Sequence, residues 1–241
     1  MKILALDTSN QPLTVAVLVD GKIQASETLT THKKHAEFLL PVIEDLVQKS
    51  GLKPVDIDRV VAAVGPGSYT GIRMATTFAK SFASTLDKEL VAVSSLLALA
   101  LNVRDEEVLI NPIFDGRNQN MFTGLYQWQN GQLKTVVDDQ HTNMDDWLKQ
   151  LANVELPIVI VGETDNFVGP YKDALGSQIQ VAQGLQNIPN AALLAEYGQQ
   201  LEPIKNVDGL EPRYLRLTKA EADWQAAHPN ERGGGNYVEK V

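Results

Sequence analysis

The chain has 241 residues, of which 44% are hydrophobic and 21% charged, so it can bury a sizeable core and has the composition of a folded protein. Its formal net charge of -9 disfavours a stand-alone nucleic-acid binder, because the surface as a whole repels polyanions. The absence of cysteine excludes disulfides, thiol nucleophiles and thiolate metal sites.

The start of the chain reads as a β-hairpin rather than as a signal peptide. Its apolar positions are interrupted early by Asp7, Ser9, Asn10 and Gln11. No apolar run approaches the ~20 residues that a helix needs to span a bilayer. We therefore expect a cytoplasmic protein with no membrane association.

The first part of the chain predicts a mixed sheet with helices. Alternating apolar residues and turn residues predict three antiparallel strands in succession. Two continuous apolar strands then alternate with helices, and the first helix ends at Gly51. The predicted strands are 2–8, 13–19, 22–28, 59–65 and 90–94, and the predicted helices are 35–51, 72–87 and 95–101.

The same order of elements begins again near Glu107, although no short sequence repeat accompanies it. The predicted strands are 108–114, 120–128, 132–138 and 157–162, and the predicted helices are 144–152 and 190–201. The sequence therefore predicts an α/β protein of two domains, 1–105 and 106–216. The remaining segment, 217–241, is rich in Pro, Gly and charge, and we expect it to be a mobile tail.

A glycine-rich turn, "GPGSYTGIR", joins a predicted strand to a predicted helix. Its marked residues, here called the signature turn, are Gly65, Gly67, Ser68, Thr70, Gly71 and Arg73. The P-loop pattern fails because no Lys follows the second conserved Gly, and the dinucleotide pattern fails because its third Gly is missing. Two interpretations remain: a structural turn capped by Ser68 or Thr70, or an anion site on the free N–H groups of the helix, assisted by Arg73.

Four segments together resemble the TsaB (YeaZ) family over nearly the whole chain: "ALDTS" at 5–9, "GPGSYTGIRMA" at 65–75, "VSSLLALA" at 93–100 and "PRYLR" at 212–216. The resemblance implies the actin-like ATPase (ASKHA) fold, with two domains that each have a mixed sheet flanked by helices. It also implies a role beside TsaD and TsaE, which together place a threonylcarbamoyl group on an adenosine next to the tRNA anticodon. TsaB is the subunit without catalytic equipment.

The resemblance further implies that this chain has no catalytic residue, cofactor site or metal site. TsaD binds its metal partly through two His spaced H-x-x-x-H, and the matching positions here are Ser95 and Leu99. A leucine cannot ligate a metal. The hairpin after Asp7 lacks the Gly and Lys that hold nucleotide phosphates in this fold, and Gly162 stands alone where catalytic relatives have a pair.

The remaining candidate residues favour structural roles. His32 and His35 lie three residues apart without an evident third ligand, and His141 and His228 have no visible partner. Asp115, Arg117 and Asn118 stand where the family typically has Asp-Ala-Arg, and a hairpin turn explains them without a function.

Two predicted helices of the first domain carry more apolar surface than one sheet can bury. Their apolar arcs cover about 200° and about 180°, whereas one buried face needs a little over ~100°. Either other helices of this chain cover the excess, or it forms an interface. The resemblance favours pairing with TsaD through these helices, and self-pairing when TsaD is missing. The expected interface residues are Leu39, Ile43, Met74, Phe78 and Phe82.

The sequence therefore predicts a non-catalytic scaffold subunit that supports a TsaD homologue, helps to recruit a TsaE homologue and reaches tRNA only indirectly. The main alternative is an enzyme of the same fold, either a metalloprotease-like endopeptidase or a small-molecule kinase. A homodimeric interaction protein without a tRNA role is the third possibility.

Overall fold

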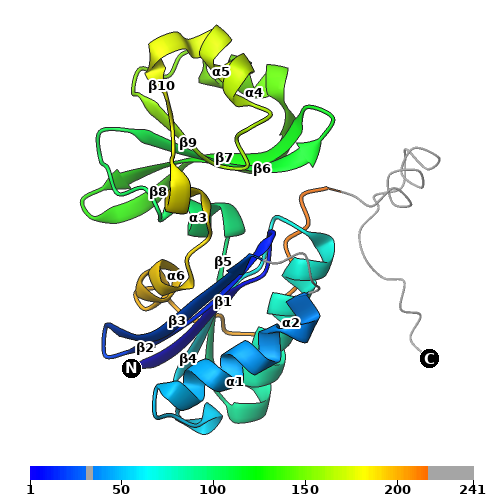
Figure 1. Cartoon of the computed structure of the whole chain (residues 1–241), viewed down its shortest axis with the longest axis vertical. Helices are drawn as coiled ribbons and strands as arrows, with labels where there is room; N and C mark the ends of the chain where they lie inside the picture. The colour runs from blue at the N-terminus through cyan, green and yellow to red at the C-terminus, as the bar shows by residue number, and fades with distance from the viewer. Residues whose placement is uncertain (31–34, 217–241) are drawn as a thin grey trace, which may run out of the picture.

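The computed structural model describes residues 1–30 and 35–216, so the predicted tail at 217–241 lies outside the described residues. Two lobes are stacked along the long axis, and each is built on a five-stranded sheet (Figure 1). Helices α3 and α6 lie between the lobes.

The first sheet has the strand order β3-β2-β1-β4-β5. β1 pairs antiparallel with β2 and parallel with β4. Its strands are β1 (Lys2–Asp7), β2 (Pro12–Val19), β3 (Lys22–Thr30), β4 (Arg59–Ala63) and β5 (Glu89–Val93). The central strands are buried along nearly their whole length, as their continuous apolar sequences predict.

The second sheet repeats this arrangement. Its order is β10-β9-β6-β7-β8. If the strands of each sheet are numbered 1 to 5 in chain order, and the second sheet is read from its β8 edge, both sheets have the order 3-2-1-4-5. The strands are β6 (Leu109–Arg117), β7 (Asn120–Gln129), β8 (Gln132–Asn143), β9 (Ile158–Gly162) and β10 (Ile179–Val181). The architectural duplication predicted from the sequence is confirmed, and the fold is the actin-like ATPase fold.

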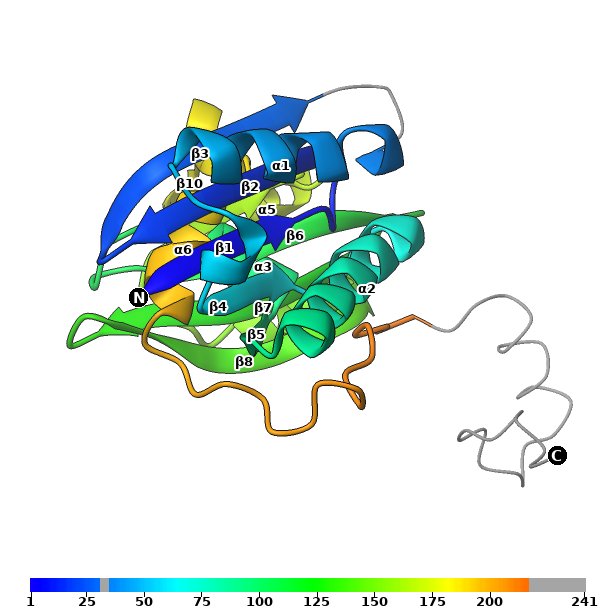
Figure 2. The same ribbon diagram turned by 90° about the horizontal axis from the view of Figure 1, so that it is seen from below.

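Helices cover both faces of each sheet. Their bounds are α1 (Leu39–Lys49), α2 (Tyr69–Leu86), α3 (Ser95–Ala100), α4 (Met144–Leu151), α5 (Val168–Leu175) and α6 (Ala191–Gly198), with short 3-10 turns η1 (His35–Glu37), η2 (Pro54–Asp56), η3 (Gly176–Gln178) and η4 (Gly184–Asn187). α1 lies over β2 and β3, and α2 lies over β4 and β5, on the face away from the second lobe (Figure 2). On the second sheet, α3 packs on one face, and α4 and α5 pack on the other.

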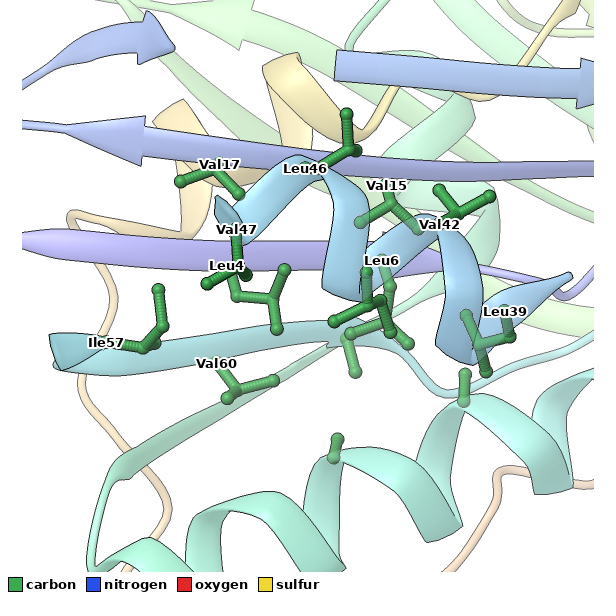
Figure 3. Packing of buried hydrophobic residues seen from close by; sticks show 14 of the residues in the cluster. Leu4, Leu6, Val15, Val17, Leu39, Val42, Leu46, Val47, Ile57 and Val60 are labelled. Atoms are coloured by element: carbon green, nitrogen blue, oxygen red, sulfur yellow. The ribbon is translucent and has the colours of Figure 1, made fainter. Parts of the chain in front are cut away.

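The core beneath α1 is made of aliphatic side chains from the sheet and from one helix face. Leu4 and Leu6 of β1 and Val15 of β2 lie under Val42 and Leu46 of α1 (Figure 3). All five are buried. Apolar burial of this kind contributes roughly 25 cal/mol per Å², so this face fixes α1 firmly on the sheet.

Several features differ from the sequence-based expectations. α2 begins at Tyr69 rather than at residue 72, and β8 extends to Asn143 rather than ending at residue 138. The helix predicted from residue 35 begins at Leu39, after the 3-10 turn η1, and α5 and β10 were not predicted. α6, predicted in the second domain, packs against β1 and β2 of the first sheet. Arg59 of β4 fixes the end of α6 by donating from Nη1 to the carbonyl oxygens of Gly198, at 2.8 Å, and Leu201, at 2.9 Å.

The chain stays with the first lobe after α6. Ile204, Val207 and Leu210 pack against the core of the first sheet. Residues 191–210 therefore contact the first lobe, although the division into 1–105 and 106–216 assigned them to the second; that division into domains stays a prediction. Within the described part of the chain, no helix is both long and apolar enough to cross a membrane.

Candidate functional site

An apolar groove runs between α1 and α2 on the outer face of the first lobe. It consists of two open hollows of about 590 and 680 Å³ that share Leu40, Phe78 and Ser81 and are therefore continuous. We call this surface the docking groove. Its apolar lining residues are Ala36, Leu39, Leu40, Ile43, Val47, Leu52, Pro54, Met74, Phe78, Phe82 and Leu86.

The five predicted interface residues all line this groove, but they are not equally accessible. Leu39 and Ile43 are only 3% and 6% exposed, because their side chains point into the core of the first sheet. Met74, Phe78 and Phe82 are half-buried along α2, and the rings of the two phenylalanines lie 5.5 Å apart. A partner can therefore contact much more of the α2 residues than of Leu39 and Ile43.

Leu40 is the residue that the sequence analysis did not select. It is 60% exposed and lies where the two hollows meet. An exposed leucine next to half-buried aromatic rings is typical of an interface, because a contiguous apolar patch is costly on a monomer. Leu40 belongs to the predicted apolar arc of α1, but the sequence did not show which edge of that arc faces solvent.

The other flank of α2 is covered by the same chain. Lys80 donates from Nζ to the carbonyl oxygen of Asp208 at 2.7 Å, and Ser84 donates to Asp208 Oδ1 at 2.9 Å. Figure 2 shows this segment, in orange, running from α6 towards the start of α2. The wide apolar arc of α2 thus has two explanations at once: the chain covers one edge of it, and the other edge faces the docking groove.

The signature turn packs against the β1–β2 hairpin. Ser68 is the N-cap of α2, and its Oγ accepts from the N–H of Gly71 at 3.4 Å. The N–H of Ser68 donates to the carbonyl oxygen of Ser9 at 2.7 Å, and the hydroxyl of Thr8 donates to the carbonyl oxygen of Gly71 at 2.7 Å. The hairpin is therefore tied to the signature turn at Ser68 and Gly71.

Glycine is required at this turn because backbones approach closely. A Cβ added to Gly67 would lie 2.3 Å from the carbonyl oxygen of Ser9, and one added to Gly71 would lie 1.9 Å from that of Thr8. Gly65 and Gly67 also have positive φ values of 117° and 153°. These contacts favour the structural interpretation of the turn.

A polar cleft of about 770 Å³ separates the lobes at the signature turn. It is lined by Ser9, Asn10, Pro66, Gly67, Ser68, Tyr69, Ile72, Phe114, Asp115, Gly116, Arg117, Asn118, Phe122, Glu163, Arg213, Tyr214, Leu215 and Arg216. Its charged lining residues are Asp115, Glu163, Arg117, Arg213 and Arg216, and the last two belong to the chain's own segment 213–216. Among the described residues, no lysine lines the cleft.

Burial raises the pKa of two acidic groups beside the cleft. Desolvation raises the pKa of the fully buried Asp7, although the N–H of Ser9 donates to its Oδ1 at 2.7 Å. Burial likewise raises the pKa of Glu163, whose Oε2 accepts from the N–H of Asp115 at 2.6 Å. Among the described residues, Asp7 Oδ2 and Ser9 Oγ are buried without a hydrogen-bond partner.

The described histidines contact residues other than Ser95 and Leu99, the two positions of α3 that align with metal ligands. Ser95 is buried and accepts from the N–H of Gly65 at 3.0 Å, and Leu99 is buried in the core between the lobes. His35 contacts the carbonyl oxygen of Gln11 at 2.7 Å, and the ring of His141 lies against Phe122. His32 and His228 lie outside the described residues. Within 1–30 and 35–216, no three His, Asp or Glu residues are grouped as a metal site would require.

The β6–β7 turn holds Arg117 and Asn118 in an unusual conformation. Both have positive φ values, 66° and 52°, and so does Gln119 at 61°. The side chain of Asp115 accepts from the N–H of Arg117 at 2.7 Å and from Asn166 Nδ2 at 2.9 Å. Asp115 thus stabilises the turn, in agreement with the structural role predicted for it.

The duplicated sheets, the cleft between them and the helical face on the first lobe define a protein of the actin-like ATPase fold. A family model described as TsaD: tRNA N6-adenosine threonylcarbamoyltransferase matches residues 9–224. A Bacillus subtilis protein called tRNA threonylcarbamoyladenosine biosynthesis protein TsaB is 40% identical over 93% of this chain and 98% of its own length. The chain therefore belongs to this family, within its TsaB (YeaZ) group.

Two further comparisons agree with this assignment. A Haemophilus influenzae protein with the same TsaB name is 26% identical over 90% of this chain and 94% of its own length. The crystal structure of a Pseudomonas aeruginosa protein, described as similar to peptidase YEAZ, superposes with a TM-score of 0.72 at 24% identity, covering 89% of this chain and 99% of that one. The latter similarity concerns the fold alone.

Proposed function

We propose that this chain is a non-catalytic scaffold subunit in the biosynthesis of threonylcarbamoyladenosine in tRNA. It binds a TsaD homologue through the docking groove and helps to recruit a TsaE homologue to the resulting complex. It acts in the cytoplasm and reaches tRNA through its partners. The observation that carries the proposal is the continuous apolar groove between α1 and α2 in a chain that is closely related to a TsaB protein.

The chemistry of the groove supports a helical protein partner. Leu40, Phe78 and Phe82 offer apolar surface from two helices, and side chains of a partner helix can pack into the groove between them. Its charged lining residues are Arg73, Glu44 and Lys53. An apolar centre with a polar rim is the usual anatomy of a protein interface.

The same surface is where we propose that the chain self-associates when the partner is missing. A two-fold axis through the groove would bring Leu40 and Phe78 of one copy against the same residues of the other, which is the simplest way to cover one patch. We expect the isolated chain to be a symmetric dimer that the TsaD homologue dissociates, because both interactions use one groove.

The non-catalytic part of the proposal rests on the signature turn and the cleft. The backbone of Thr8 and Ser9 packs closely against Gly71 and Gly67, which supports a structural role for the turn, and no lysine lines the cleft among the described residues. The competing proposal is an enzyme of the same fold, a metalloprotease-like endopeptidase or a small-molecule kinase. Metal analysis and an ATPase assay on the purified chain separate them: stoichiometric metal or turnover like that of a true ATPase would contradict the scaffold role.

Partner binding is tested by calorimetry with the purified TsaD homologue. We expect a one-to-one complex, to which the TsaE homologue then adds in gel filtration. Failure of the TsaD homologue to bind at micromolar concentration would remove the proposal. Binding that persists when the docking groove carries a charge would place the interface elsewhere on the molecule.

A further inference from the structure

The segment Pro212–Arg216, here called the strap, is held by the first lobe beside the signature turn. The N–H of Arg213 donates to the carbonyl oxygen of Val64 at 2.8 Å. The carbonyl oxygen of Arg213 lies so close to Gly65 that a Cβ there would approach it to 2.5 Å. The strap therefore lies alongside Val64 and Gly65, where the chain leaves β4 and enters the signature turn.

The same strap is also held by the second lobe. Arg213 Nη1 donates to Asp139 Oδ2 of β8 at 2.8 Å, and the side chain of Asp139 is only 1% exposed. Arg216 Nη1 donates to the carbonyl oxygen of Gly116 in the β6–β7 turn at 3.2 Å. Through Arg213 and Arg216, this five-residue segment thus forms hydrogen bonds with both lobes.

Asp139 joins the strap to two further elements. Ser94, the N-cap of α3, donates from Oγ to Asp139 Oδ2 at 2.5 Å, and the hydroxyl of Tyr126 donates to Oδ1. A carboxylate buried this deeply must keep its donors, since an unpaired buried charge is strongly unfavourable. The first lobe, the second lobe and the strap therefore meet at one charged group.

The strap also contacts the docking groove. The ring of Tyr214 stacks on that of Tyr69 with the centroids 5.1 Å apart, and Tyr69 is the first residue of α2. Arg73 Nη1 donates to the hydroxyl of Tyr69 at 2.7 Å, and both residues line one end of the groove. Tyr214 thus contacts the first turn of α2, a helix that forms one wall of the docking groove.

We propose that the strap is a latch between the lobes, and that Arg213 and Tyr214 are positioning residues for the docking groove. Arg213 fixes the angle between the two sheets through Asp139. Tyr214 transmits this arrangement to the start of α2 through Tyr69. The second half of the proposal rests on the proposed function, because it concerns the affinity for the TsaD homologue.

The latch is tested on the full chain by distance measurement between two spin labels. The chain has no cysteine, so single cysteines at the exposed positions Val55 and Val136 can be labelled selectively, one on each lobe. Labelled chain is diluted into unlabelled chain so that only intramolecular distances are recorded. We expect a narrow distance distribution for the native sequence and a broader one for Arg213→Ala. An unchanged distribution would overturn the latch.

Arg104 provides the matched control. It forms an exposed ion pair with Glu196 at 2.7 Å on another side of the lobe junction. Arg104→Ala should leave the distance distribution as it is in the native chain. A distribution that broadens equally in both variants would contradict a specific role for the strap, because the loss of any arginine pair would then have the same effect.

The positioning role is tested by titrating the TsaD homologue into Tyr214→Ala and Tyr214→Phe. We expect Tyr214→Ala to raise the dissociation constant about tenfold, since a stacked aromatic pair contributes enough for one decade in affinity. Tyr214→Phe keeps the ring and should restore native affinity. Equal affinities for all three proteins would overturn the positioning role. A native chain that fails to bind would instead remove the proposed function, while the distance measurement still tests the latch.

Discussion

The most direct perturbation of the docking groove is a charge at Leu40. This side chain is 60% exposed, so the folded chain depends little on it, and a partner can bury most of it. Complete burial of a leucine contributes about 1.5–3 kcal/mol, so the exposed part offers a partner about 1–2 kcal/mol. Leu40→Ala should therefore weaken association about fivefold or more.

Leu40→Asp should have a much larger effect than Leu40→Ala. The carboxylate would be desolvated in the middle of the groove, which adds about 2 kcal/mol or more to the lost apolar contact and gives roughly a 100-fold loss of affinity. In a symmetric dimer the substitution occurs twice. We expect the variant to be monomeric in sedimentation at micromolar concentration and to bind the TsaD homologue too weakly for calorimetry.

Leu185 supplies the control for this experiment. It is a leucine that is 83% exposed in the 3-10 turn η4, outside the groove. Leu185→Asp should leave both association reactions unchanged, and both variants should keep the native circular dichroism. The reasoning is refuted if Leu40→Asp associates like the native chain, or if Leu185→Asp weakens association as strongly.

Three further predictions concern other parts of the molecule. Phe78→Asp should give a monomer that keeps most of its helical circular dichroism and loses binding of the TsaD homologue; outright unfolding would assign Phe78, which is half-buried, to the internal core. Gly67→Val should lower the free energy of unfolding by about 1–3 kcal/mol in denaturant titrations, because the new side chain would clash with Ser9 and strain the backbone. Gly131 also has a positive φ, 73°, but has open space around it, so Gly131→Val should lower the free energy of unfolding by less. The raised pKa of Asp7 means that its ionisation opposes folding once the pH exceeds 3.8, the ordinary pKa of the group. Asp7→Asn should therefore raise the melting temperature at pH 7, and this gain should shrink as the pH falls through the raised pKa towards 3.8. A lower melting temperature of the variant at pH 7 would indicate that the charge is stabilising.

The sequence predicted the duplicated sheets because every strand except β10 carries a clear local signal. The continuous apolar run at 60–63 predicts a buried strand from its own residues. Asp20 and Gly21 likewise predict a turn from local sequence alone. β10 was missed because it has only three residues. α5 was missed because its eight residues include a Gly and a Pro, both poor helix formers.

The placement of α6 and the strap could not be predicted in the same way. α6 follows β10 of the second sheet in the sequence but packs on β1 and β2 of the first, and no local pattern within 191–198 indicates which sheet it covers. The contact between Arg213 and Asp139 joins residues 74 positions apart. Local patterns do not determine long-range contacts of this kind, although "PRYLR" was visible as part of the family resemblance.

The docking groove was predicted in outline and adjusted in detail. The apolar arcs identified both helices, but a helical arc does not show where the sheet ends and solvent begins. Leu39 and Ile43 lie on the side of α1 that the sheet buries, whereas Leu40 faces outward. One step of about 100° around the helix separates Leu39 from Leu40, and only the packing of α1 on β2 and β3 decides between them.

The central claim is that this chain supports tRNA modification as a scaffold without catalysing a step itself. It is tested most directly by reconstituting threonylcarbamoyl transfer to tRNA from purified TsaD and TsaE homologues, with and without this chain. The account predicts that modification requires the chain and that Leu40→Asp supports it poorly, while Leu185→Asp supports it fully. Full modification in the absence of the chain would contradict the scaffold role.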